Sequence, residues 1–215
     1  EHTQHPTVMS DYLLRPGDSE FRAGVSRYLQ WLARNRQNQL TFHMLNTVDL
    51  EAWTPYMQDI TVEAAALGID VGIIIGFVDQ QQNAFRLFKP RESDPETGES
   101  VPAEVQITTK IDRFAESGIK LLGFQIGTSE FTKPDEADML SWLNLAVEHL
   151  ATQHPQIEPY AWIHITCGLE RESGGPYYHL PLEADPRLGA FVHTTMFYEL
   201  ENPAPVYDCE DFSHQ

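Results

Sequence analysis

The segment Leu121–Phe131, LLGFQIGTSEF, carries the acidic side chain best placed for catalysis. An apolar run through Ile126 indicates a strand, and Gly127-Thr128-Ser129 then leads to the carboxylate of Glu130. In a parallel α/β barrel the active site lies at the carboxyl ends of the strands, so an acid in this position predicts a catalytic group. The alternative is that Glu130 helps to start the helix that Phe131-Thr132-Lys133-Pro134 opens, because helix N-termini favour acids.

Polar side chains also alternate with apolar ones along four expected strands. In the first of them Leu40, Phe42 and Met44 would face the helices, which leaves His43 on the opposite face. The same alternation assigns to that face Gln125, His164 and His193. A packed barrel normally fills this face with Val, Ile and Leu, and buried polar groups are costly unless they are paired. The four residues therefore predict a ligand-binding cavity, and the alternative for each histidine is a core residue with a satisfied hydrogen bond.

Helical and extended patterns alternate along the whole chain. The expected helices cover residues 21–32, 54–68, 107–118 and 139–150. The expected strands cover residues 40–45, 71–78, 121–127, 160–167 and 191–198. This alternation indicates a parallel sheet covered by helices, either an open doubly wound sheet or a barrel. Neither a G-x-G-x-x-G motif nor a Walker motif occurs, so nucleotide binding is poorly supported.

Two irregular segments interrupt the pattern. Residues 89–102 cluster Pro, Gly, Ser and acids, which indicates a solvated excursion. Residues 168–189 are expected to form a long loop that includes one turn of helix, and long loops in compact domains are usually functional or mobile. Neither is typical of an interdomain linker, because the alternation resumes after each. We expect residues 1–215 to be a single domain or a fragment of one, with residues 1–18 as an N-terminal extension.

The composition of the chain limits the kinds of partner that it can bind. The 215 residues carry a net charge of −18, which argues against binding to nucleic acid or to an anionic membrane surface. Neither a membrane span nor a signal peptide is visible. The two cysteines, Cys167 and Cys209, have no metal-binding spacing and are expected to be plain thiols. The chain begins at Glu1, so we expect a processed, trimmed or excised product; signal removal after export would favour an extracellular or periplasmic location.

A family resemblance rests on two short motifs. Tyr28–Asn38 followed by Gln39–His43 resembles the first helix and second strand of the catalytic barrel in glycoside hydrolase family 20, the β-hexosaminidase type. The family's fourth strand ends in Gly-Gly-Asp-Glu, to which Gly127-Thr128-Ser129-Glu130 is similar. By this resemblance Glu130 matches the general acid. Ser129 stands where the family has the aspartate that orients the substrate's acetamido group, so the resemblance does not carry the acetamido-assisted mechanism over to this chain.

The resemblance covers about Phe21–Phe131 and implies an incomplete TIM barrel. If residues 40–45 are the second strand, the first lies before Phe21, where Val8–Leu14 is the candidate, and the last two lie beyond Gln215. A closed (β/α) barrel of eight strands takes roughly 250 residues. We therefore expect an α/β, parallel TIM-barrel-like fold with five to six of the eight strands in this chain, completed by other parts of the same polypeptide.

We interpret the chain as a carbohydrate-active barrel protein, a glycoside hydrolase with Glu130 as general acid. The residues expected to bind the substrate are His43, Gln125, Ser129, His164 and His193. Glycoside hydrolysis usually needs a second carboxylate, for which Glu199 and Asp211 are candidates, and Tyr198 is positioned to stabilise positive charge at the anomeric carbon. This interpretation needs no metal or other cofactor, and its partner is a carbohydrate or another small molecule.

Two other interpretations stay open. In the first, the chain is a metal-dependent barrel enzyme, a sugar isomerase or hydrolase, in which Glu130, His164 and His193 bind a divalent cation. High metal content and sensitivity to chelators would distinguish it. In the second, the chain is a non-catalytic carbohydrate-binding barrel, which Ser129 in place of the family's aspartate favours.

Overall fold

The computed structural model describes residues 13–78, 84–126, 134–164 and 170–193. In chain order its elements are α2 (Ser19–Arg34), β1 (Gln39–His43), α3 (Leu50–Ala66), β2 (Asp70–Gly76), α4 (Ala103–Ala115), β3 (Leu121–Gln125), α5 (Glu136–Gln153), β4 (Glu158–His164), the 3-10 helix η2 (Tyr177–Glu183) and β5 (Gly189–His193). No helix in these described segments has the length and apolar character needed to cross a membrane.

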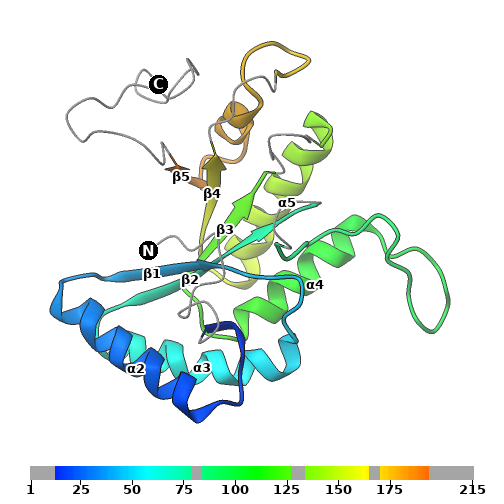
Figure 1. Cartoon of the computed structure of the whole chain (residues 1–215). Helices are drawn as coiled ribbons and strands as arrows, with labels where there is room; N and C mark the ends of the chain where they lie inside the picture. Colours follow the sequence, from blue (N-terminus) through cyan, green and yellow to red (C-terminus); the bar gives the residue numbers. More distant parts are fainter. Residues whose placement is uncertain (1–12, 79–83, 127–133, 165–169, 194–215) are drawn as a thin grey trace, which may run out of the picture.

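The five strands form one parallel sheet in which neighbours in space are also neighbours in the chain (Figure 1). The connections between successive strands are α3, α4, α5 and η2. A doubly wound sheet reverses its strand order and carries helices on both faces. The order here never reverses, which is the winding of a (β/α) barrel, so the fold is α/β with an open, barrel-type sheet.

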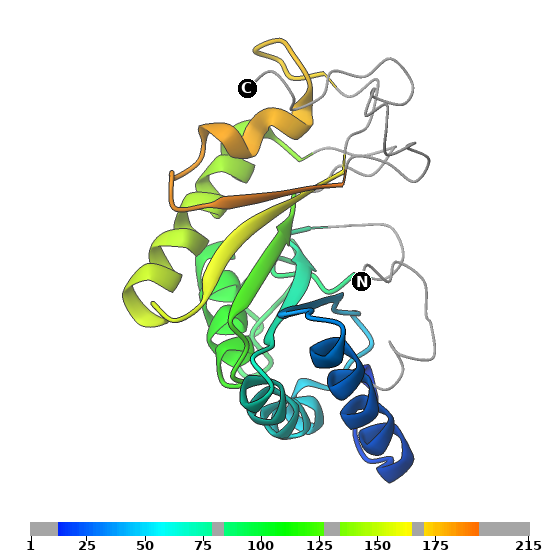
Figure 2. The ribbon, with the colours of Figure 1, turned by 90° about the vertical axis from the view of Figure 1, so that its left-hand side faces the viewer.

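The two faces of the sheet have different environments. Alternate residues of a strand point to opposite faces, and the helix-facing set packs with the helices into the main core. That set includes Leu40, Phe42, Val71, Ile73, Ile75, Leu122, Phe124, Ala161 and Ile163. Figure 2 shows that the sheet curves and that the helices follow its convex side. We call the other side the concave face; its residues are Thr41, His43, Ile74, Leu121, Gln125, Tyr160, Trp162 and Phe191.

The start of α3 differs from the sequence prediction. Thr54-Pro55 fits the usual pattern of a helix N-terminus, but the helix begins at Leu50 and Pro55 lies inside it. The reason is Asp49, whose carboxylate accepts a hydrogen bond of 3.0 Å from the backbone N–H of Glu51. An aspartate N-cap satisfies one of the free N–H groups of the first turn, so the helix starts one turn earlier than the proline suggests.

The N-terminal part of the described chain also differs from the prediction. Val8–Leu14 is the sequence's candidate for a first strand, but Leu13 and Leu14 are helical, and residues 8–12 lie outside the described segments. Both leucines are buried in the main core. The carbonyl oxygen of Leu13 accepts a hydrogen bond of 2.9 Å from the indole N–H of Trp53 in α3. This part of the chain therefore packs against α3.

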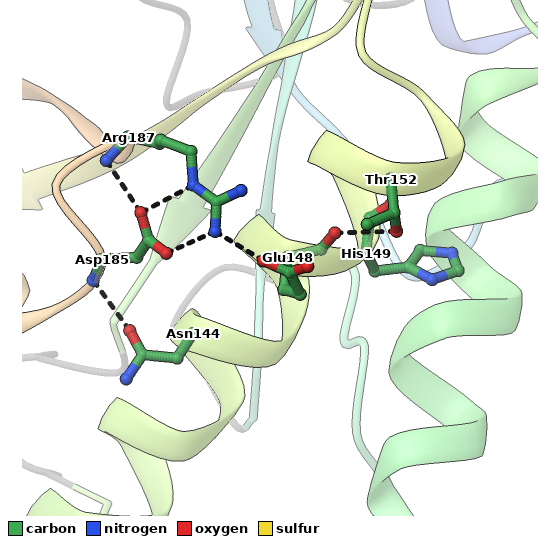
Figure 3. A network of polar contacts seen from close by, with 6 residues as sticks. All are labelled: Asn144, Glu148, His149, Thr152, Asp185 and Arg187. Atoms are coloured by element: carbon green, nitrogen blue, oxygen red, sulfur yellow. Dashed lines mark hydrogen bonds and ion pairs between the residues drawn. The ribbon is translucent and has the colours of Figure 1, made fainter.

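The connection between β4 and β5 is held against α5 by a polar network (Figure 3). Arg187 forms ion pairs with Asp185 and with Glu148 of α5, the latter at 2.6 Å. The backbone N–H of Asp185 donates to Oδ1 of Asn144, also in α5, at 2.8 Å. Hydrogen bonds from Arg187 lower the pKa of Asp185 to about 2, so this carboxylate stays ionised near neutral pH. The network sets the position from which β5 enters the sheet.

Candidate functional site

The concave face brings together three residues from three strands. Nε2 of Gln125 lies 3.5 Å from Nδ1 of His43, a long and weak hydrogen-bond contact. The imidazole of His43 meets the edge of the Trp162 indole, with ring centroids 5.2 Å apart and an interplanar angle of 87°. The alternation of β1 and β3 predicted His43 and Gln125 on this face, and the structure places both there. Their role in binding a substrate stays a prediction.

Gln125 has an unsatisfied acceptor on this face. Its Oε1 atom is buried and has no hydrogen-bond partner within the described part of the chain. Buried polar atoms are almost always paired, and those that are not need a specific explanation. The amide nitrogen of Gln125 makes one weak contact with His43, and the amide oxygen is available to accept a hydrogen bond from a group outside the described residues.

Tyr160 also carries a buried polar atom on the concave face, two residues before Trp162 on β4. Its side chain is only 3% exposed, and its hydroxyl has no hydrogen bond of good geometry to any described residue. Burial raises the pKa of this hydroxyl, and the nearby Thr41 side chain offsets the rise in part, so Tyr160 is a neutral phenol at physiological pH. The ring packs edge-on against Phe191 at a centroid distance of 4.4 Å. A neutral hydroxyl here can both donate and accept.

Gly123 makes room for that tyrosine. A Cβ atom at this position would lie 2.5 Å from Cζ and 2.7 Å from the hydroxyl of Tyr160. We expect Gly123→Ala to lower the free energy of unfolding by about 1–3 kcal/mol, because the ring has to move out of a packed layer. Urea denaturation measures the effect. Gly189→Ala is the matched control: its Cβ would meet neighbours at 3.6 Å, so its cost should stay within about 0.5 kcal/mol. Equal costs at the two glycines would contradict the packing argument.

All the predicted catalytic residues lie outside the described segments: Glu130, Tyr198, and the two candidates for the second carboxylate, Glu199 and Asp211. The predicted substrate-binding residue Ser129 also lies outside them. The helix that follows this segment, α5, begins at Glu136, and its N-cap is Asp135. Glu130 lies outside the described residues, so its role as a catalytic acid and its alternative role at the helix start both stay predictions.

His164 and His193 are described at the level of the backbone. They are the last residues of β4 and β5, and the parallel register pairs them directly. Adjacent strands lie about 4.8 Å apart, so the register brings the two positions together at the carboxyl end of the sheet, as expected for a barrel site.

Sequence reasoning missed Tyr160 and Trp162. The signal was present, because in Tyr160-Ala161-Trp162-Ile163-His164 both aromatics share the parity of the predicted site residue His164. Ile163 belongs to the core under the helices, and Trp162 packs on the concave face. The site therefore combines aromatic rings with polar groups, which is typical of small-molecule pockets.

No protein-family model matches the chain, and no curated protein sequence matches it. Its fold is similar to an O-GlcNAc hydrolase of Thermobaculum terrenum, with a TM-score of 0.48 and 13% identity over 80% of this chain and 37% of that one. It is also similar to a maltogenic alpha-amylase of Thermotoga neapolitana, with a TM-score of 0.45 and 12% identity over 70% of this chain and 44% of that one.

A third similar structure is a family 20 exo-β-N-acetylglucosaminidase of Vibrio harveyi, with a TM-score of 0.45 and 10% identity over 70% of this chain and 34% of that one. The chain thus spans between 34% and 44% of the length of these three structures. The fold assignment for this chain depends on its own strand order and helix placement.

Proposed function

We propose that this chain is part of a carbohydrate-active barrel, which binds a saccharide over the concave face and cleaves a glycosidic bond with Glu130 as general acid. The observation that carries the binding part is a pair of buried polar atoms, Oε1 of Gln125 and the hydroxyl of Tyr160, which have no hydrogen bond of good geometry to any described residue and lie close to the Trp162 indole. Saccharides present hydroxyl groups at the edges of their rings and apolar C–H groups on the faces. Unpaired polar atoms next to aromatic rings match both features.

The proposal assigns roles to the remaining predicted residues. His43 and Gln125, the last residues of β1 and β3, bind hydroxyl groups of the saccharide, and so do His164, His193 and Ser129. Asp211 or Glu199 supplies the second carboxylate, and Tyr198 stabilises positive charge at the anomeric carbon. The complete barrel includes other parts of the same polypeptide, and the saccharide is its small-molecule partner.

The substitution Gln125→Leu tests the binding role. Because the buried amide oxygen has no partner among the described residues, leucine should leave the free energy of unfolding unchanged or raise it. The same change should weaken saccharide binding by about two- to twelvefold, the equivalent of one net hydrogen bond. A glycan array identifies the saccharide, and isothermal titration with it measures the dissociation constant.

Gln106→Leu is the matched control for this experiment. Gln106 in α4 is also buried, but its amide bonds the backbone of Lys89 and of Val101, at distances between 2.8 and 3.2 Å. Its loss should lower the free energy of unfolding by about 1–3 kcal/mol and leave the saccharide affinity of the folded protein unchanged. Unchanged saccharide affinity after Gln125→Leu would refute the proposed binding surface, and so would the absence of any glycan ligand.

The second candidate function is the metal-dependent barrel enzyme. The observation that favours it is the direct pairing of His164 with His193 at the carboxyl ends of β4 and β5. Two imidazoles on adjacent strands, with Glu130 as a third ligand, would form the three-ligand set of a catalytic metal site. Metal that is lost on His164→Gln would support this function over acid catalysis by Glu130.

A further inference from the structure

A second cluster of chemically active side chains lies on the helical layer, away from the concave face. Oδ1 of Asp112 in α4 is 2.6 Å from Nε2 of His149 in α5 and 2.6 Å from Nε2 of His154. Figure 3 shows that His149 points away from the Arg187 network and toward α4. Among the residues that the structure describes, these three side chains bring metal-ligating atoms within 4.8 Å of one another.

The two histidines converge because the helix ends between them. In a continuous helix, residues five positions apart point about 140° away from each other. His154, however, is the C-cap of α5, with φ −136° and ψ 56°, so the chain has left the helical path there. Its N–H donates to the carbonyl of Leu150 at 2.8 Å, and its own carbonyl accepts from the N–H of Ile157 at 2.9 Å. This turn holds the second imidazole beside the first, with ring centroids 5.8 Å apart.

The donor set fits a first-row divalent metal ion. Two imidazole nitrogens and one carboxylate oxygen are ligands that zinc takes in proteins, whereas magnesium and calcium prefer oxygen alone. A tetrahedral zinc ion with ligands at about 2.1 Å separates them by roughly 3.4 Å. The present 2.6 Å contacts would have to open by less than 1 Å, which side-chain rotation can supply.

The cluster is buried on the side of its two histidines and exposed to solvent on the side of Asp112. The side chains of His149 and His154 are 16% and 20% exposed, and that of Asp112 is 50% exposed. The histidines are therefore held by packing, while the carboxylate edge faces solvent, where a water molecule can occupy a fourth position. A structural zinc site usually has four protein ligands, so three ligands with an open side predict a site that exchanges its metal with solution.

We propose that Asp112, His149 and His154 bind one divalent transition-metal ion, with zinc as the best fit, and that the ion clamps α4 to α5. His154 precedes β4, so the site lies toward the amino ends of the strands. In barrels this end contributes to stability, and chemistry takes place at the carboxyl end. The proposed site is thus separate from the concave face and from Glu130, His164 and His193, and its role is to stabilise the fold.

The test begins with chain stripped by EDTA and titrated with zinc chloride in a calorimeter. One zinc ion per chain is expected at this site. Asp112→Asn, His149→Gln and His154→Gln should each weaken that binding by more than the roughly 10–100-fold that the loss of an outer-shell partner causes, because each removes a direct ligand. Asp59→Asn, an exposed carboxylate on α3, is the matched control and should bind zinc like the native chain. Far-ultraviolet circular dichroism confirms that each variant is folded.

Two further measurements separate this site from other ligands in the chain. Zinc should raise the melting temperature of the native chain and of His164→Gln, but not that of the three ligand variants, because the ion stabilises only the folded helix pair. Cobalt(II) in place of zinc should give weak visible d–d bands without the intense near-ultraviolet band of a thiolate ligand, which excludes Cys167 and Cys209.

The proposal is overturned by any of three results: no zinc binding by the native chain, zinc binding that survives all three ligand substitutions, or zinc binding that His164→Gln alone abolishes. In the first case the cluster is a hydrogen-bonded carboxylate between two imidazoles. The last result would move the metal to the sheet and support the metal-dependent function instead. Failure of saccharide binding would leave the helix-layer site untouched, so the two proposals fail separately.

Discussion

Replacing Glu130 with glutamine is expected to slow the hydrolysis of an aryl glycoside by about 10²–10⁴-fold, the usual contribution of a positioned general acid. The amide keeps the shape of the carboxyl group but cannot deliver a proton to the leaving oxygen. Saccharide affinity and folding should therefore change little. Because barrel-type sites draw residues from several strands, the rate has to be measured in a protein whose barrel is complete.

Glu104→Gln is the matched control for that substitution. Glu104 lies in the first turn of α4, where its negative charge interacts favourably with the helix dipole. Its loss should cost at most about 1 kcal/mol of stability and leave the hydrolysis rate unchanged. An unchanged rate after Glu130→Gln would end the hydrolase assignment for this residue. A protein that binds the same saccharide with Gln125 and Trp162 but never cleaves it would instead be the non-catalytic carbohydrate-binding barrel.

Replacing Trp53 with alanine is expected to lower the free energy of unfolding by about 3–5 kcal/mol. Trp53 is fully buried in α3, and its ring meets Phe114 of α4 edge-on at a centroid distance of 6.0 Å. Its indole N–H also bonds the carbonyl of Leu13, which the substitution would leave unpaired. The total stability of a domain is about 5–15 kcal/mol, so this loss is large. Urea denaturation followed by circular dichroism measures it.

Trp31→Ala provides the matched control. Trp31 lies on α2 with 54% of its surface exposed and stacks on Tyr28. The same deletion of an indole should there cost only about 0.5 kcal/mol. Trp53→Phe should fall between the two, because it keeps most of the ring and loses the bond to Leu13. If Trp53→Ala costs no more than Trp31→Ala, α3 is not packed against the N-terminal segment as described.

Local sequence patterns were sufficient to predict in what order strands and helices follow one another along the chain. They also predicted the sheet face on which several residues lie. Leu40 and Phe42 pack under the helices, and His43 lies on the concave face, because alternation along a strand is a property of the backbone itself. The start of α3 was misplaced for a local reason: two competing N-terminal signals lie one turn apart, and Asp49 prevails over Thr54-Pro55.

The sequence by itself determined the alternating α/β pattern and the sheet face on which His43 and Gln125 lie, because both depend on periods of two or about 3.6 residues along a single element. Only the tertiary structure decided that the strands follow one another without reversal, that Gly123 makes room for Tyr160, and that Asp112 meets His149 and His154. These contacts join residues from different elements. A period states which side of an element is apolar, but the neighbour that covers this side follows from how the elements pack, and packing is a property of the whole chain.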